Sequence, residues 1–236
     1  MKESFCDLKF ITNEGNVPVI LYVSNQKMDF KAVDVYKQVK LNFGDKFDFC
    51  ELIVDDWDSM LTPWGVSNCL KNRKFSGRGN ELLTQITDEI IPAIDKRFPN
   101  HRQVYIAGYS LAGLFSLWTL YQSKIFDGAV CCSGSLWYPG WEEYMMQSSL
   151  AKDVKVYLSL GKKEPKNKHP LLQRVGDITL KQYEVLKQDK NVKALFFEWN
   201  NGGHFSDVVD RIAKGICWII FEETYHEAEK YTNCSK

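Results

Sequence analysis

The chain has 236 residues, of which 44% are hydrophobic and 25% are charged, a composition typical of an ordinary globular domain. Basic and acidic residues number 30 each, so the chain has no overall charge that would attract nucleic acid or an anionic membrane surface. No apolar stretch approaches the roughly 20 residues that a transmembrane helix needs, and the first seven residues contain no apolar run typical of a secretory signal. We therefore expect a cytoplasmic protein that binds neither nucleic acid nor membranes.

Strand-like and helix-like segments alternate along the whole chain. In chain order we expect strand 17–24, helix 31–41, strand 47–54, helix 80–98, strand 103–108, helix 111–121, strand 128–133, strand 154–160, helix 177–187, strand 193–199 and helix 205–221. This alternation predicts an α/β protein with a mostly parallel central sheet and helices on both faces. Strands buried on both faces should be continuous apolar runs, and residues 104–108 (VYIAG) and 154–160 (VKVYLSL) fit this pattern. Pro92 should kink the long helix or start a new turn within it.

The chain shows no internal repeat, low-complexity segment or linker, so we expect a single domain over residues 1–236. Residues 56–79 form the longest stretch without clean periodicity and are rich in Asp, Ser, Pro, Gly and Trp. A loop of that length in a compact domain is usually functional. Because it follows a strand, it should lie at the carboxyl edge of the sheet, where open α/β folds bind ligands.

The seven cysteines are an odd number and include no C-x-x-C pair and no metal-ligand spacing with histidine. Most lie in apolar runs, which favours buried free thiols in a reducing compartment. Adjacent Cys131 and Cys132 would point to opposite faces of a strand, so a bond between them is not expected. We expect no metal and no cofactor.

Residues 108–113, with the sequence GYSLAG, lie between a buried strand and a helix and indicate a nucleophilic serine, Ser110. Small residues at Gly108 and Ala112 would let the strand and the helix pack closely around a sharp turn. A strict G-x-S-x-G motif has glycine where Ala112 stands. The backbone N–H of Leu111 begins the helix and is the expected first oxyanion donor. The alternative is that Ser110 is an ordinary helix N-cap.

A serine nucleophile needs a general base, and His204 is the histidine best placed for that role. It lies in the glycine-containing loop 200–205, after a late strand and before a long apolar helix. His101 precedes its strand and would lie at the opposite edge, whereas His169 and His226 lie in charged segments. The alternative is that His204 is merely a polar residue at the start of a helix.

The acid that orients the histidine should lie between Ser110 and His204 in the chain. Glu164 follows the strand 154–160 and therefore emerges at the same sheet edge. The other candidates fit less well, because Asp177 begins a helix, Asp153 lies at the wrong end of its strand and Asp207 follows the histidine. The alternative is that Glu164 is a solvated carboxylate beside two lysines.

At these motifs the chain resembles the esterase D-like family of esterases, which includes siderophore-ester hydrolases and feruloyl esterases. The resemblance covers roughly residues 15–222 and is carried by residues 61–64, 107–115, Trp118, 132–139, 159–164 and 202–204. It implies an α/β-hydrolase fold with a minimal lid and ester hydrolysis by Ser110, His204 and Glu164 as a catalytic triad. Many members carry aspartate where this chain has Glu164.

Two loops at the expected catalytic edge should supply the pocket. The backbone N–H of Trp57 or Asp58 is the expected second oxyanion donor. An aromatic wall that binds substrate is expected from Trp64, Trp137, Tyr138 and Trp141, with Trp57 beside them. The alternative for each aromatic residue is that it caps the core. The short segment 135–151 leaves an open, modest pocket, which favours small or exposed esters.

Basic residues in the same loops would either attract an anionic substrate or form a solvated rim; they are Arg73, Lys74, Arg78, Lys162, Lys163, Lys166 and Lys168.

The sequence thus predicts a metal-independent serine esterase that acts on a small-molecule ester through an acyl-enzyme. Acyl transfer to another alcohol at the same site is one alternative. A binding protein that keeps the fold without turnover is the other. The oligomeric state stays open, with a homodimer among the alternatives.

Overall fold

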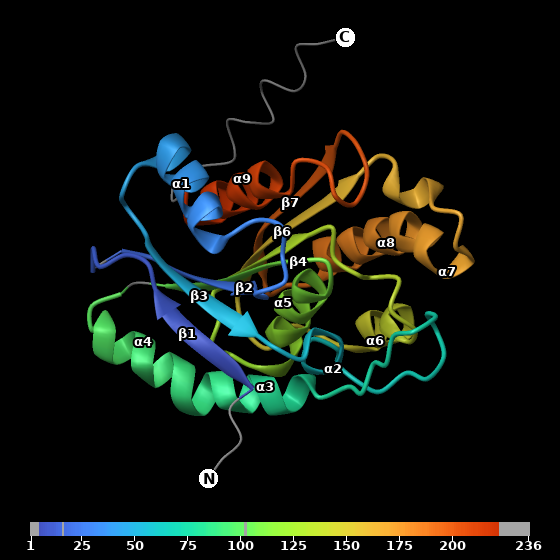
Figure 1. Cartoon of the computed structure of the whole chain (residues 1–236), viewed down its shortest axis with the longest axis horizontal. Helices are drawn as coiled ribbons and strands as arrows, with labels where there is room; N and C mark the ends of the chain where they lie inside the picture. Colours follow the sequence, from blue (N-terminus) through green and yellow to red (C-terminus); the bar gives the residue numbers. More distant parts are fainter. Residues whose placement is uncertain (1–4, 16, 102, 222–236) are drawn as a thin grey trace.

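The computed structural model describes residues 5–15, 17–101 and 103–221. His226 and Cys234 lie outside these residues. Within the described chain, the strands form one seven-stranded sheet in the order β1-β3-β2-β4-β5-β6-β7 (Figure 1). The strands are β1 Cys6–Phe10, β2 Val19–Ser24, β3 Asp48–Val54, β4 Val104–Tyr109, β5 Gly128–Cys132, β6 Val154–Gly161 and β7 Val192–Asn200. Only β1 runs antiparallel to its neighbour, so the predicted mostly parallel sheet is confirmed.

Helices cover both faces of the sheet, as the alternation predicted. On one face, α1 (Ala32–Phe43) and α9 (Val208–Ile220) pack side by side against alternate residues of the central strands. The other face is covered by α3 Gly79–Gln85, the π-helix η1 Ile86–Ile90, α4 Ile91–Arg97, α5 Leu111–Gln122, α6 Trp141–Gln147 and α8 Val175–Gln188 (Figure 1). The short helices α2 (Trp57–Met60), η2 (Glu164–Lys166) and α7 (Pro170–Gln173) lie in loops.

The strand order places a topological switch point at the middle of the sheet. The chain passes from β2 to β3 on one side and then continues from β4 on the other side of β2. Open α/β sheets bind ligands where the strand order reverses, because the loops leaving the two neighbouring strands diverge there. The loops after β2 and β4 therefore frame the natural place for a site.

The predicted long helix 80–98 is interrupted just before Pro92. The N–H of Ile91 bonds to the carbonyl of Ile86, five residues earlier, and α4 then begins with Pro92 in its first turn. Proline has no N–H to donate and its ring crowds the preceding turn, so the wider π-turn accommodates it. The new turn predicted at Pro92 is confirmed.

Two expectations about individual elements are wrong, and one strand was not expected. Strand β7 lies at the sheet edge and is mostly half-exposed, whereas burial on both faces was expected. Helix α9 starts at Val208, and residues 203–207 remain a loop in which Asp207 has a positive φ of 51°. Strand β1 was missed because only Cys6 of its five residues is buried, so the segment carries little apolar signal.

The segment 56–79 is more structured than its composition suggests. It contains α2 and an isolated bridge between Val66 and Phe75. Among the described residues, six cysteines are free and four of these are buried. No helix in the described part of the chain has the length and apolarity to cross a membrane.

Candidate active site

Ser110 lies in the sharp turn between β4 and α5, with a backbone φ of 60° and ψ of −120°. A non-glycine residue in this region of φ/ψ space is strained and persists only where the surrounding structure enforces it. Close packing does so here, because a Cβ at Gly108 would collide with the backbone carbonyl group of Ala112. The turn therefore holds the serine side chain at the carboxyl edge of the sheet, at the start of a helix.

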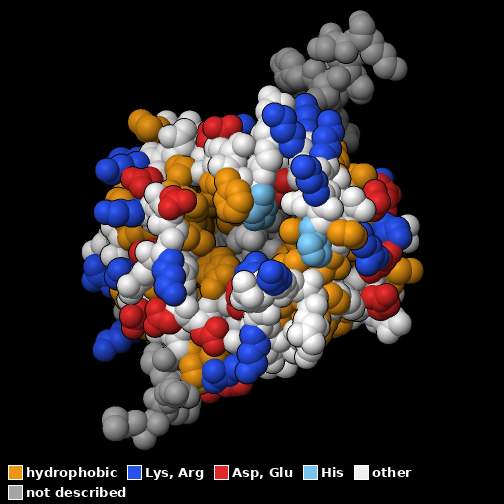
Figure 2. All heavy atoms as spheres, turned by 45° about the vertical axis from the view of Figure 1, so that its right-hand side comes forward, with side chains coloured by type: hydrophobic (Ala, Val, Ile, Leu, Met, Phe, Trp, Pro, Cys, Tyr) orange, Lys and Arg blue, Asp and Glu red, His pale blue; other side chains and the backbone are white. Residues whose placement is uncertain are grey.

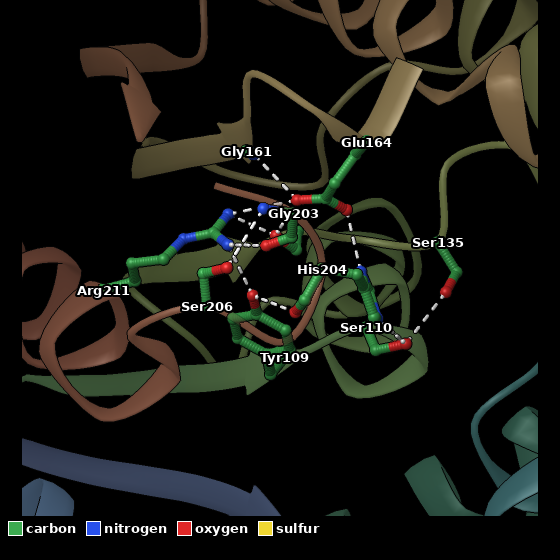
Figure 3. Close-up of polar contacts among 10 residues, drawn as sticks. Tyr109, Ser110, Ser135, Gly161, Glu164, Gly203, His204, Ser206 and Arg211 are labelled. Atoms are coloured by element: carbon green, nitrogen blue, oxygen red, sulfur yellow. Dashed lines mark hydrogen bonds and ion pairs between the residues drawn. The ribbon is translucent and has the colours of Figure 1, made fainter. Parts of the chain in front are cut away.

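His204 connects this serine to Glu164. The histidine Nε2 lies 3.1 Å from Ser110 Oγ, and its Nδ1 lies 2.7 Å from Glu164 Oε2 (Figure 3). The three side chains come from the segments that follow β4, β6 and β7. The structure thus brings together the three residues that the sequence placed at one sheet edge.

Glu164 is a buried carboxylate with a complete set of partners. Its side chain is 5% exposed, and its Oε1 accepts hydrogen bonds from Ser133 Oγ at 2.6 Å and the Gly161 N–H at 2.7 Å. Burial raises the pKa of Glu164, but the hydrogen bonds from His204, Ser133 and Gly161 and the charge of His204 outweigh it. The net effect holds the pKa of this carboxyl below its ordinary value, so it is ionised at neutral pH.

A buried arginine that the sequence analysis did not single out lies behind this pair. Arg211 of α9 is 1% exposed, and its Nη2 contacts Ser133 Oγ and lies 3.3 Å from Glu164 Oε1. Its Nη1 donates to Tyr109 Oη at 2.6 Å and to the Gly203 carbonyl at 3.3 Å. A sequence signal did exist, because Arg211 lies on the same helix face as Gly215 and Trp218, where an apolar residue is expected.

Ser135 is a second polar residue that the sequence analysis missed. Its Oγ lies 3.3 Å from Ser110 Oγ, and its N–H donates to the Ser110 carbonyl at 2.9 Å (Figure 3). The side chain lines the same cavity as Ser110. The Ser110 hydroxyl therefore has hydrogen-bonding partners on two sides, Ser135 and His204.

These residues open into a cavity of about 1360 Å³, with Ser110, Glu164 and His204 in its wall. Figure 2 shows the hollowed face, with histidine, hydrophobic and basic side chains gathered around it. The expected modest pocket is wrong, because this volume exceeds the usual 300–1,000 Å³ of a small-molecule site. The cavity is large because it extends between the loops after β2, β3 and β6.

The aromatic wall is only partly where the sequence placed it. Trp57 and Trp137 line the cavity. Tyr138 is 1% exposed and donates to the Trp64 carbonyl, while Trp64 Nε1 donates to the Pro139 carbonyl. Trp141 is fully buried and donates to Gln182. Trp64, Tyr138 and Trp141 are thus not among the residues that line the cavity. Trp64 packs against Tyr138 and Tyr144, and Trp141 packs against Tyr121 and Tyr144.

The expected oxyanion donors lie at two helix starts. Leu111 is the first residue of α5, and Trp57 and Asp58 form the first turn of α2 and line the cavity. The first N–H groups of a helix have no partner within it, so both turns have donors to offer. The role of each N–H stays a prediction.

The basic loop residues divide into two groups. Arg73, Lys74, Arg78 and Lys163 line the cavity, but Arg73 pairs with Asp58 and Arg78 pairs with Glu81. The other three predicted basic residues, Lys162, Lys166 and Lys168, lie outside the cavity wall. Within the described residues, no group of three or more His, Cys, Asp or Glu side chains could hold a metal ion.

Solved structures share this architecture. Siderophore hydrolase EstB from Aspergillus nidulans matches 91% of this chain and 89% of its own with a TM-score of 0.69 and 16% identity. An IroE-like serine hydrolase from Shewanella oneidensis covers 91% and 75%, with a TM-score of 0.71 and 14% identity. The enterobactin and salmochelin hydrolase IroE covers 93% and 97%, with a TM-score of 0.65 and 17% identity. At these identities the similarity shows the fold, and it confirms the predicted α/β-hydrolase architecture.

Sequence comparison reaches a curated relative and a family. The chain is 29% identical over 134 residues to the uncharacterized protein YbbA of Bacillus subtilis strain 168, a match that covers 54% of this chain and 53% of that protein. The chain thus spans about half the length of this relative. The model of the esterase family, described as "Putative esterase", matches residues 55–209. This match includes the turn at Ser110, the acid loop and His204, and the chain therefore belongs to this esterase family.

Proposed function

We propose that the protein hydrolyses carboxylic esters with Ser110 as nucleophile, His204 as general base and Glu164 as the acid that orients the histidine. The observation that carries the proposal is the continuous chain of contacts from Ser110 Oγ to His204 Nε2, at 3.1 Å, and from His204 Nδ1 to Glu164 Oε2, at 2.7 Å. Distances of this size allow a proton to pass between nucleophile and base.

The first half of the reaction forms an acyl-enzyme. Ser110 Oγ attacks the ester carbonyl carbon while its proton moves to His204 Nε2. The imidazolium that results is stabilised by ionised Glu164, to which Nδ1–H donates. When the tetrahedral intermediate collapses, the bond to the alcohol oxygen breaks, and this oxygen takes the proton from Nε2.

The negative charge of the tetrahedral intermediate falls on the former carbonyl oxygen. The N–H of Leu111 begins α5 and lies directly after the nucleophile in the chain, so it is the first donor that we assign to this oxygen. The second donor is assigned to the first turn of α2, at Trp57 or Asp58, which lies across the same cavity.

The second half of the reaction releases the acyl group as a carboxylic acid. A water molecule takes the place of the alcohol and gives a proton to His204 Nε2 as its oxygen attacks the acyl carbon. Collapse of the second intermediate returns the proton to Ser110 Oγ. Acyl transfer would follow the same steps with an alcohol in place of water.

A fluorophosphonate probe tests the nucleophile directly. It should label Ser110 covalently, and Ser110→Ala should abolish both labelling and hydrolysis of p-nitrophenyl acetate. Ser67→Ala, which changes an exposed serine in the 56–79 segment, should leave both unchanged. Absence of labelling in folded wild-type protein would rule out the proposal.

The substrate is best approached by a screen. Several structural neighbours bear names of siderophore hydrolases, so siderophore-type esters belong in the panel beside acetyl and feruloyl esters. Adding an acceptor alcohol and analysing the products would separate acyl transfer from hydrolysis.

A further inference from the structure

We infer that Arg211 is a positioning residue of the proposed active site, which holds Glu164 and the His204 loop in the arrangement required for proton transfer. The inference rests on the proposed function. Its basis is that the buried guanidinium of Arg211 contacts both the Glu164 carboxylate and the backbone carbonyl of Gly203, the residue before His204 (Figure 3).

The contacts on the acid side fix the carboxylate. Arg211 Nη2 lies 3.3 Å from Glu164 Oε1 and also contacts Ser133 Oγ, which itself donates to Oε1. With the Gly161 N–H as a further donor, Oε1 is fully engaged, and Oε2 is the oxygen left to face His204. The guanidinium therefore helps decide which carboxylate oxygen serves the histidine.

The contacts on the base side fix the backbone that carries the histidine. Arg211 Nη1 donates to the Gly203 carbonyl and to Tyr109 Oη, and Tyr109 Oη in turn donates to the His204 carbonyl at 2.7 Å. The loop 201–207 has no regular secondary structure of its own. Arg211 and Tyr109 thus hold two successive carbonyl groups of this loop in place.

Without a partner, Arg211 at this position would lower the folding stability. A charged group that is 1% exposed loses its hydration, and a cation in the first turns of α9 opposes the helix dipole. Glu164 offsets this cost with a charge of opposite sign, so each of the two buried charges needs the other. This mutual dependence couples the arginine to the acid of the site.

Other charged and titratable groups lie on the elements around the Glu164–Arg211 pair. Tyr109 lies on β4 and Cys132 on β5, while Lys163 precedes Glu164 at the cavity and Lys166 ends η2. On α7 and α8, which pack against η2, the nearest charges in sequence are Arg174 and Asp177.

Some of these neighbouring charges have partners of their own. Arg174 forms an ion pair with Glu142. Asp207 and Asp210 lie at the start of α9, and Asp210 pairs with Lys214. Among the described residues, Glu164 forms ion pairs with His204 and with Arg211.

The first test is the pH profile of kcat/KM in Arg211→Met. Without the buried cation, the first proton added to the Glu164–His204 pair binds more tightly, so the acid limb should move up by about one pH unit. Because the carboxylate and the loop lose their common anchor, kcat should also fall on the order of 10-fold or more. Lys214→Met removes a half-exposed cation from the same helix and should leave the acid limb unchanged.

The second test asks whether the effect passes through Glu164. In a Glu164→Gln background, Arg211→Met should cause no further movement of the acid limb, and the two losses in kcat should not multiply. An unmoved acid limb in folded Arg211→Met protein, or full multiplication of the losses, would overturn the inference.

A third variant serves if Arg211→Met does not fold. Arg211→Lys keeps the charge but lacks the forked donors, so the acid limb should stay near its wild-type position while kcat falls. The low-field proton resonance of the His204–Glu164 hydrogen bond should shift in the same variant. Wild-type kcat together with an unchanged resonance would contradict the positioning role. Failure of the proposed function would look different, because Ser110→Ala would then retain hydrolysis.

Discussion

At the scale of single residues, the site depends on how fully Glu164 is satisfied. A buried carboxylate with weaker partners would hold a proton at neutral pH, but here hydrogen bonds from His204 Nδ1, Ser133 Oγ and the Gly161 N–H lower its pKa and keep it ionised. Arg211 Nη2 is a fourth contact of the same carboxylate. The contacts that would prepare Glu164 for its proposed role in catalysis also contribute to folding stability. Function and stability are therefore linked at this residue through pH.

Glu164→Gln should destabilise the protein at pH 7 on the order of 3 kcal/mol, because it leaves Arg211 without its opposite charge. The pKa of Glu164 is depressed below its ordinary 4.5. The stabilisation by the carboxylate is therefore complete above that value and is lost as the pH falls through the folded-state pKa. Urea unfolding from pH 7 to pH 3 should show the difference between wild type and variant shrinking below pH 4.5; a constant difference would contradict the linkage.

Ser135 allows a second prediction at this scale. Its hydroxyl lies 3.3 Å from Ser110 Oγ and helps fix the serine rotamer. Ser135→Ala should lower kcat by about 10-fold or less, since His204 still binds the nucleophile. Steady-state kinetics on p-nitrophenyl acetate would measure this, and a loss as large as that of Ser110→Ala would mean that Ser135 itself reacts.

At the scale of elements, the turn between β4 and α5 depends on close packing of a strand against a helix. Ala112 fits where the usual motif has glycine, whereas Gly108 cannot carry even one more carbon. The strained conformation of Ser110 persists because the flanking elements have no room to relax.

Gly108→Ala should therefore destabilise the fold by about 1–3 kcal/mol and remove most of the activity, because the helix must move away from the strand and take Ser110 with it. Gly203→Ala is the matched control for stability, since a Cβ there meets only the Cβ of Lys163 at 4.0 Å. The denaturation midpoint and kcat should fall together in the first variant, and the denaturation midpoint should change little in the second. Full activity of Gly108→Ala would disprove the packing argument.

Most helices and strands could be predicted from the sequence, because the spacing of the apolar residues follows the period of a helix or a strand. Ser110, Glu164 and His204 each follow a predicted strand, so parallel topology alone brings them to one edge. Their catalytic roles stay predictions. The aromatic residues could not be placed in this way, because Trp64, Tyr138 and Trp141 lie in or next to loops whose side-chain directions follow no period. Arg211 was overlooked because a charge inside a predicted helix is usually solvated.

At the scale of the whole molecule, the size of the cavity changes the expected substrate. The sequence suggested small or exposed esters, but a volume of about 1360 Å³ accommodates much larger acyl or alcohol groups. Trp57 and Trp137 in its wall offer apolar surface for such groups.

The value of kcat/KM for p-nitrophenyl esters should therefore not fall as the acyl chain lengthens from acetate to octanoate. Each buried methylene group stabilises the bound ester by about 0.8 kcal/mol where it meets apolar wall. Trp137→Ala should weaken this preference for the longer esters and affect acetate less. A steep fall beyond butyrate in the wild type would show that the cavity is closed to acyl chains.

The contacts of Arg211 also bear on when the protein becomes active as it folds. The guanidinium joins groups 102, 78 and 47 positions earlier in the chain, at Tyr109, Ser133 and Glu164. Contacts across such separations close late, because the intervening chain must first be ordered. A nascent or truncated chain that ends before Arg211 can form its early strands and still lack a working site. If Arg211 has the role that we infer, enzymatic activity depends on the formation of α9.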